Sequence, residues 1–222
     1  MKKYSTIKIV AIFFLVILAM GCKKNAEKTS RVDALPYYKD ASFTPEWFTA
    51  DDQALANFHK IPGFKLLSQN GAIISDKTFE DKIYVTDFFF TTCPGICPKM
   101  TSNMAVLQEA FKADDTVLLL SHSVTPEIDS VAVLKKYAEE KGVDASKWYL
   151  ATGDRSEIYS LGRESYFVEE DLGEIKTEDD FLHTENFVLI DKNKHIRGIY
   201  NGLNKAAIQQ LITDIKTLQK EG

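Results

Sequence analysis

The chain has 222 residues, 27 basic and 32 acidic side chains, and a formal net charge of −5. Its length is enough for one domain with a substantial hydrophobic core. The acidic balance, with a pI of about 5.5, and the lack of any basic cluster in the sequence exclude a general nucleic-acid binder.

The N-terminus has the pattern of an export signal. A short basic start precedes an apolar run over residues 9–20, which is too short for a membrane span of ~20 residues but typical of a secretory signal peptide. The run ends in the letters LAMGC, and small residues directly before a cysteine resemble the lipobox of bacterial lipoproteins. That resemblance implies removal of residues 1–21 and acyl chains on Cys22, where each buried CH₂ adds ~0.8 kcal/mol of membrane affinity. We therefore expect a lipid-anchored protein of the bacterial cell envelope, with its domain on the periplasmic side. The alternatives are a simple signal peptide or an uncleaved N-terminal anchor, each with an incidental Cys22.

Residues 22–55 are expected to form the lipidated N-terminus and a tether. From residue 23 to about residue 50 the sequence is polar and irregular, and it contains Pro36 and Pro45. Such a composition is typical of a linker that holds a domain away from a membrane. The remaining residues, 56–222, are predicted to form a single domain, and nothing in the sequence indicates more than a monomer.

The domain is predicted to open with a β-hairpin. Two short apolar runs, residues 64–67 and 72–74, flank a turn that contains Asn70-Gly71. An Asn-Gly pair favours a tight primed turn between antiparallel strands. The hairpin is expected to extend the main sheet at its N-terminal side.

Strands and helices then alternate along the chain. Strands are predicted over residues 83–90, 116–122, 148–151, 186–190 and 196–200. Helices are predicted from about residue 98 onward, over residues 128–141 with Gly142 at the end, and over residues 157–163 and 205–220. The order implies an α/β fold with a central mixed sheet flanked by helices. Residues 169–180 are rich in acids and are expected to form an exposed loop.

Cys93 and Cys97 lie between the first buried strand and its helix. The amide groups of a helix's first turn are unsatisfied and the helix dipole is positive there, so a thiolate is favoured. A structural disulfide across so small a loop would stabilise the fold little, which favours a functional role. Two close sulfurs suit a soft ion, Cu(I) or zinc, but a third ligand is needed. A CxxxC at this position also makes the predicted sheet thioredoxin-like.

The four histidines supply one candidate for that third ligand. His183 directly precedes the strand over residues 186–190, and in a thioredoxin-like sheet this segment lies beside the start of the active-site helix. A lone loop histidine is more often a surface residue, and this alternative stays open on geometry alone. His122 is expected to be a hydrogen-bonded structural residue, and His59 and His195 are expected at the surface. Met100 and Met104 have the helical spacing of core residues rather than of thioether ligands.

Three stretches resemble one known family, the Sco/SenC copper chaperones. DFFFTTCPGICP (residues 87–98) is similar to the family's CPxxCP signature, and FLHT (residues 181–184) resembles its distal-histidine segment. LSHSVTPEID (residues 120–129) resembles its S-V-D-P-x-x-D segment, with Thr125 where Asp is usual. The resemblance implies a thioredoxin-like fold that binds one copper ion, Cu(I) or Cu(II), through Cys93, Cys97 and His183. It also implies delivery of that copper to the CuA centre of cytochrome oxidase subunit II.

Asp87 is an acid inside an otherwise apolar strand, six residues before Cys93. Burial of an unpaired carboxylate is costly, so its pKa is expected to be raised or its oxygens paired. One hypothesis is that Asp87 lies beneath the cysteines and relays protons for thiol–disulfide chemistry. The alternative is a structural role in which it binds a nearby lysine or backbone donor.

Three functions therefore compete. A metallochaperone, a carrier rather than an enzyme, needs Cys93, Cys97 and His183. A thiol–disulfide oxidoreductase that reduces the CuA cysteines needs the two thiols but not the histidine. A thiol peroxidase ranks last, because such sites place a threonine three residues before the cysteine and Thr91 is two before it.

Overall fold

The computed structural model describes residues 32–49, 51–169 and 180–221. The predicted signal peptide, Cys22 and nearly all of the acidic stretch lie outside these residues. Within them, no helix combines the length and the apolar character needed to cross a bilayer.

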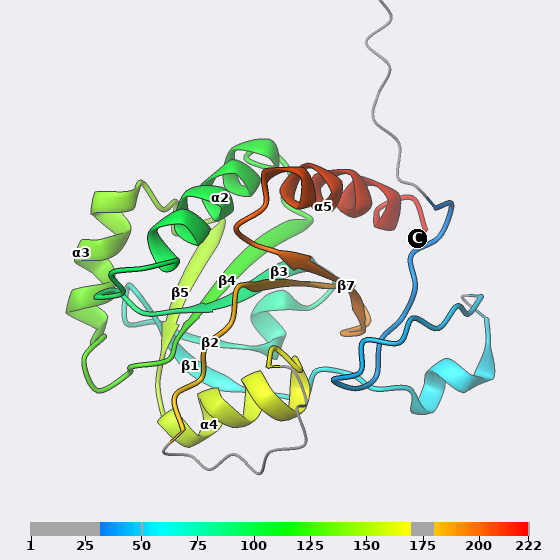
Figure 1. The fold of residues 1–222 in the computed structure, drawn as a ribbon, viewed down its shortest axis with the longest axis horizontal. Helices are drawn as coiled ribbons and strands as arrows, with labels where there is room; N and C mark the ends of the chain where they lie inside the picture. Colours follow the sequence, from blue (N-terminus) through cyan, green and yellow to red (C-terminus); the bar gives the residue numbers. More distant parts are fainter. Residues whose placement is uncertain (1–31, 50, 170–179, 222) are drawn as a thin grey trace, which may run out of the picture.

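A seven-stranded mixed sheet forms the centre of the molecule, in the order β2-β1-β5-β4-β3-β6-β7 (Figure 1). Only the β3–β4 and β4–β5 pairs are parallel. The strands are β1 (Lys65–Ser68), β2 (Ile73–Ser75), β3 (Ile83–Phe89), β4 (Val117–Ser123), β5 (Trp148–Thr152), β6 (Asn186–Ile190) and β7 (Ile196–Asn201). The predicted central mixed sheet with an N-terminal hairpin is confirmed.

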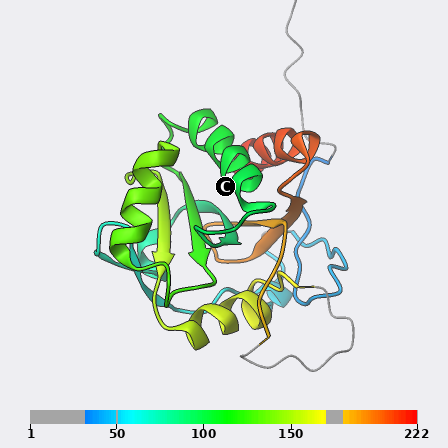
Figure 2. The ribbon, with the colours of Figure 1, turned by 60° about the vertical axis from the view of Figure 1, so that its left-hand side comes forward.

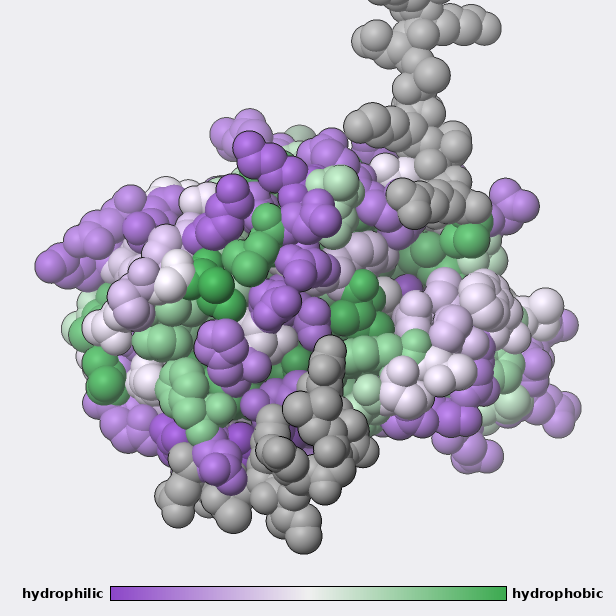
Figure 3. Space-filling model, viewed as in Figure 1, coloured by the Kyte–Doolittle hydropathy of each residue, from purple (hydrophilic) through white to green (hydrophobic). Residues whose placement is uncertain are grey.

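Helices cover both faces of the sheet, as Figures 1 and 2 show. One apolar cluster joins the sheet to α2 (Cys97–Ala110), α3 (Val131–Lys141) and α5 (Lys205–Leu218). A second cluster joins the other face to α4 (Arg155–Ser160) and to a single π-helical turn, η3 (Leu161–Ser165). Two short 3-10 helices, η1 (Gln53–Asn57) and η2 (Asp76–Phe79), lie in the connections. Hydrophilic side chains cover much of the face in Figure 3, with small apolar patches between them.

The central strand β3 sets the position of the thiols. All seven of its residues are buried, as expected for a strand covered on both faces. Val85 and Phe89 face the α2 side, whereas Tyr84 and Phe88 face the η3 side. By this alternation the Asp87 side chain points toward α2. The chain leaves β3 at its carboxyl end and reaches α2 through the cysteine loop.

The hairpin turn differs from the predicted one. The amide of Ser68 donates to the Ala72 carbonyl at 2.8 Å, so the loop consists of the three expected residues, 69–71. Gly71 has a φ of 75°, whereas Asn70 is not among the described residues with a positive φ. Both primed turn types, I′ and II′, need a positive φ at the first of their two central residues, which Asn70 would occupy. The hairpin is confirmed, and the turn type was wrong.

The expected tether is not free of the domain where the structure describes it. Leu35 and Tyr37 are only 3% and 7% exposed, and the Tyr38 amide donates to the Ile196 carbonyl at 3.1 Å. Arg197 holds the Leu35 carbonyl at 2.7 Å and lies over the Tyr37 ring at 3.8 Å. The expectation of a free tether was therefore wrong for residues 35–38, because these residues pack beside β7, whereas the irregular backbone was expected.

The same packing overturns the expectation that His59 and His195 lie at the surface. His195 is 3% exposed, and its Nδ1 lies 2.8 Å from the His59 carbonyl. The His59 ring is half-buried, lies 2.8 Å from the Ser165 carbonyl and contacts the Phe167 ring. His195 was wrongly placed because the sequence does not reveal that Tyr37 and Phe58 cover it, and His59 because its partners come from residues 165–167.

Candidate metal site

The two cysteines lie at the start of α2, beyond the carboxyl end of β3. Cys97 is the first residue of the helix and is 5% exposed, and Cys93 is half-buried in the loop before it. Both are free thiols. No side chain caps the N-terminus of α2, and Pro98 in its first turn has no amide hydrogen to donate. The remaining first-turn amides are therefore available to a sulfur.

The environment drives the two thiol pKa values apart. Burial alone would raise the pKa of Cys93, but hydrogen bonds from the Cys97 thiol and from the amides of Cys97, Gly95 and Ile96 outweigh it and lower that pKa. Burial, the hydrogen bond to Cys93 and the negative charges of Cys93 and Asp87 raise the pKa of Cys97 to about 12. The loop thus offers one thiolate-forming sulfur and one that keeps its proton.

Asp87 lies beneath this pair and is 2% exposed. The Ser121 hydroxyl donates to its Oδ1, and the Trp148 indole in turn donates to Ser121 at 2.9 Å. Burial raises the pKa of Asp87 to about 7, although the hydrogen bond from Ser121 opposes the shift. The side-chain partner of Asp87 is therefore Ser121 on the neighbouring strand and not the lysine considered from the sequence. A carboxyl that titrates near neutral pH lies close enough to Cys97 to affect its pKa.

Asp129 is a site residue to which the sequence assigned no role. It is fully buried, and its Oδ1 accepts from the Thr91 hydroxyl at 2.5 Å. Its Oδ2 accepts from the Thr91 amide at 3.2 Å, the Ser123 hydroxyl at 2.6 Å and the Thr125 hydroxyl at 3.1 Å. These bonds tie the loop after β4 to the residues just before Cys93. The available signal was its position at the end of the LSHSVTPEID stretch.

His183 is exposed, and its segment lies beside the cysteine loop. Phe181 contacts Phe90, three residues before Cys93, with ring centroids 5.3 Å apart and planes at 89°. Within the described part of the chain, however, no three His, Cys, Asp or Glu side chains are grouped closely enough to hold a metal ion. The structure therefore brings the two cysteines together and places Phe181, two residues before His183, against Phe90, without assembling the three donors.

The other candidate side chains have structural positions. Met100 and Met104 are 0% exposed in the core between α2 and the sheet, as predicted. His122 is fully buried on the opposite face of the sheet from Asp87, with its Nδ1 3.0 Å from the Thr86 hydroxyl. Its Nε2 has no hydrogen-bond partner among the described residues. Burial lowers the pKa of His122 to about 3, which keeps the ring neutral.

Comparison with known proteins identifies relatives over most of the chain. The SCO1/SenC family model matches residues 52–220. The crystal structure of a SCO1/SenC family lipoprotein from Bacillus anthracis str. Ames is 30% identical, covers 72% of this chain and 95% of that one, and superposes with a TM-score of 0.63.

Two further solved structures belong to relatives described with a disulfide switch and with bound copper, respectively. BsSco, described as a member of the Sco family of cytochrome c oxidase assembly proteins with a disulfide switch, is 28% identical over 72% of this chain and 93% of its own, with a TM-score of 0.60. Bradyrhizobium japonicum ScoI with copper bound is 27% identical over 72% of this chain and 98% of its own, with a TM-score of 0.56. The thioredoxin-like α/β fold expected from the sequence is confirmed by these neighbours, and the chain belongs to the SCO1/SenC family.

Proposed function

We propose that this protein is a copper metallochaperone that binds one copper ion through Cys93, Cys97 and His183. The observation that carries the proposal is the free, unequal thiol pair at the uncapped start of α2. Soft sulfur donors select Cu(I), and imidazole is a common additional ligand for copper. The contact between Phe181 and Phe90 brings the histidine segment to the same loop, and the solved structure of a relative in the same family has copper bound.

The residues divide the work of capture between them. The lowered pKa of Cys93 favours a thiolate that makes the first bond to an arriving ion. Cys97 holds its proton more tightly and loses it as the ion binds, because metal ligation requires the deprotonated sulfur. Asp87 accepts that proton in this proposal, and the support is its pKa of about 7 and the effect of its charge on Cys97. His183 completes a three-coordinate site, and such a site leaves an open position through which a recipient's donor displaces one ligand at a time.

The recipient we propose is the CuA site of cytochrome c oxidase subunit II or a similar copper protein. The support is family membership and the role in cytochrome c oxidase assembly stated for BsSco. We further propose that Cys22 carries the lipid that holds the protein to the membrane, with the domain on the periplasmic side. The support is the sequence pattern at residues 9–22 and the existence of a lipoprotein relative. We propose a monomer as the working unit.

A copper titration of the reduced protein in detergent tests the ligand set. The wild type should bind one copper tightly, and His183→Ala should weaken binding by about 10-fold or more, because one of three donors is lost. Cys93→Ser and Cys97→Ser should abolish tight binding. Cys22→Ser serves as the control and should leave the stoichiometry at one. Binding that does not respond to His183→Ala rejects the three-donor site.

A thiol–disulfide oxidoreductase is the second candidate, favoured by the separation of the two thiol pKa values. Cys93 would attack a disulfide as the thiolate, and Cys97 would resolve the mixed disulfide, so that the partner leaves reduced and Cys93–Cys97 becomes oxidised. At pH 7, iodoacetamide should alkylate Cys93 at least 10-fold faster than Cys97. Disulfide reduction that survives His183→Ala, together with weak copper binding, would favour this function over the chaperone.

A further inference from the structure

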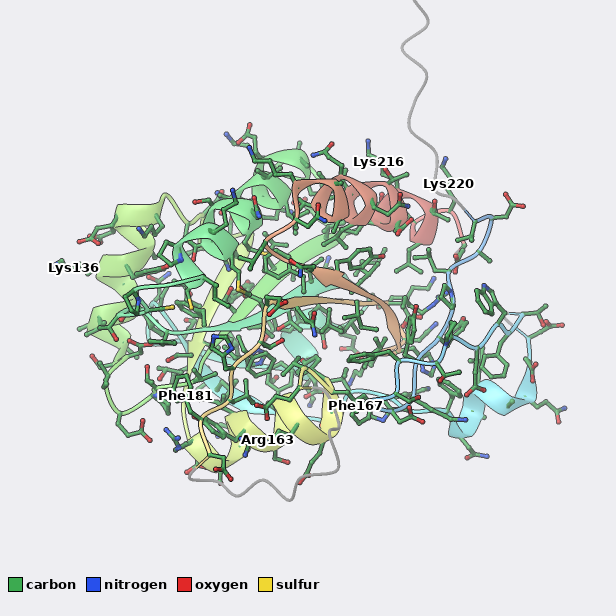
Figure 4. All side chains as sticks on the ribbon, viewed as in Figure 1. Lys136, Arg163, Phe167, Phe181, Lys216 and Lys220 are labelled. Carbon is green, nitrogen blue, oxygen red and sulfur yellow. The ribbon has the colours of Figure 1, made fainter. Side chains whose placement is uncertain are left out.

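The π-helical turn η3 contacts the segment that carries His183. Arg163, within this turn, is labelled in Figure 4 together with Phe181, which precedes His183 by two residues. Short π-helical turns are rare and are frequently found at functional sites. This turn lies on the face of the sheet opposite the thiol helix.

Arg163 and Glu169 form a half-buried ion pair at the base of the His183 segment. The Arg163 Nε lies 2.7 Å from the Glu169 Oε2, with side-chain exposures of 16% and 9%. Glu169 had been expected in an exposed acidic loop, and this expectation was wrong for that residue. Because solvent screens this largely buried pair less than an exposed one, the attraction between the two side chains is stronger.

Both members of the pair also bind the backbone near His183. Arg163 Nη2 donates to the Asp180 carbonyl at 2.5 Å, and the His183 amide donates to the Glu169 Oε1 at 3.4 Å. One ion pair therefore contacts the chain three residues before His183 and at His183 itself. Two hydrogen bonds to the backbone, one from each charged side chain of the pair, fix the path of the segment better than either bond alone.

Close packing supports the same segment from below. Leu182 is 1% exposed and lies directly against Gly162, where an added Cβ would come 2.5 Å from the Leu182 Cδ1. Downstream, the Asn186 side-chain amide donates to the Val168 carbonyl at 3.4 Å. Phe181 reaches the other way, to Phe90 next to the cysteine loop. Residues 180–186 are thus held between η3 and the loop that carries Cys93.

We propose that Arg163 and Glu169 are positioning residues for copper binding, which act by holding the His183 backbone within reach of the cysteine sulfurs. This inference rests on the proposed copper site. Neither side chain is a ligand in this account, and both act through His183. Partners that orient a metal ligand typically change metal affinity by about 10–100-fold when removed.

The experiment measures copper affinity of the full-length protein in detergent for Arg163→Gln and Glu169→Gln. Each change should weaken copper binding by about 10-fold and shift the visible spectrum of the copper(II)-loaded protein. Arg155→Gln is the matched control, because Arg155 lies over the same Tyr159 ring as Arg163 but pairs with Glu127 instead. It should change affinity by no more than roughly twofold.

A double-mutant comparison shows whether the effect passes through His183. In the His183→Ala background, Arg163→Gln should cause no further loss of affinity. An equal loss in both backgrounds, no loss in either single variant, or tighter copper binding by Glu169→Gln would each overturn the positioning role.

A metal-free measurement separates this inference from the ligand set. Amide hydrogen exchange of a peptide covering residues 181–184 should be faster in Arg163→Gln and Glu169→Gln than in the wild type and in Arg155→Gln. Unchanged exchange would reject the positioning role even where His183 proves to be a ligand. If His183→Ala leaves copper affinity unchanged while Arg163→Gln and Glu169→Gln speed amide exchange as expected, the result rejects His183 as a copper ligand. It then also rejects the proposed effect of Arg163 and Glu169 on copper binding.

Discussion

Asp87 and His122 lie on neighbouring strands and on opposite faces of the same sheet, and both are buried. Burial disfavours the charged form of each, so it raises the pKa of the acid to about 7 and lowers that of the base to about 3. Desolvation therefore acts equally on both faces, but only the face toward α2 gains a group that titrates near neutral pH. Burial by itself does not mark a functional residue; the neighbouring thiols distinguish Asp87 from His122.

The hydrogen bonds of the two residues differ in the same way. Asp87 accepts from Ser121, which also accepts from Trp148, so the acid ends a chain of donors. His122 bonds to Thr86 through one nitrogen and stacks on the Phe88 ring, with centroids 4.7 Å apart. The first environment allows a proton to be exchanged, whereas the second holds a neutral ring among aromatic side chains.

A second buried carboxylate, Asp129, gives the test with the largest expected effect. Asp129→Ala removes the acceptor for Thr91, Ser123 and Thr125 and leaves their donors unsatisfied. We expect a loss of about 3–5 kcal/mol in the free energy of unfolding, measured by urea denaturation. Thr125→Val removes one of these bonds and should cost about 1 kcal/mol. A loss below that of Thr125→Val would show that Asp129 is not the anchor of the cysteine loop.

Asp87→Asn should have the next largest effect, and it should depend on pH. The folded state holds the proton of Asp87 more tightly than the unfolded chain, so wild-type stability falls as pH rises from about 4 to about 7. The variant should therefore be more stable than the wild type by about 2–4 kcal/mol at pH 8, and the two should converge below pH 4. Urea denaturation at both pH values measures this, and equal stabilities at pH 8 would contradict the raised pKa.

His122→Gln should give a smaller effect of the opposite sign. Between about pH 6.5 and pH 3, His122 is protonated in the unfolded chain but stays neutral in the folded protein. The free energy of unfolding of the wild type therefore falls as the pH drops through this range. Between pH 8 and pH 5 this group should lower wild-type stability by about 2 kcal/mol, and the variant should lack that loss. The Asp87 and His122 contributions oppose each other in this range, so the wild type itself should vary little. A variant whose stability changes with pH as the wild type does would show that His122 is not the source.

The sequence predicted the sheet well because its central strands are apolar on both faces. The run that became β3 and the Gly142 that ends α3, with a φ of 68°, are local signals that the packing reinforces. The start of α3 was predicted too early, at residue 128, because the segment before it serves another purpose. Asp129 binds the Thr91 region and Ser130 caps the helix, so the helical path begins only at Val131.

The features that the sequence missed depend on contacts between distant segments. The π-helical turn at Leu161–Ser165 has no periodic pattern of its own, and only the segment packed on it reveals its role. His195 looked like a polar loop residue because the aromatic side chains that cover it, Tyr37 and Phe58, come from the N-terminal segment. The pair Cys93 and Cys97 was recognisable from spacing and position, whereas Arg163 and Glu169 gave no local signal.

The N-terminal segment docks beside β7 at the end of the sheet opposite the two thiols. Tyr38 pairs with Ile196 of β7, and Ile196 pairs with Ile190 of β6. Ile190 in turn pairs with Tyr84, at the amino end of β3. Cys93, by contrast, follows the carboxyl end of β3. Seven residues of strand span about 20 Å, so the chain enters the domain at one pole and offers its thiols at the other. The first described residues of the chain and the two thiols therefore lie at opposite ends of the central strand, so that a partner can approach the thiols without meeting the N-terminal segment.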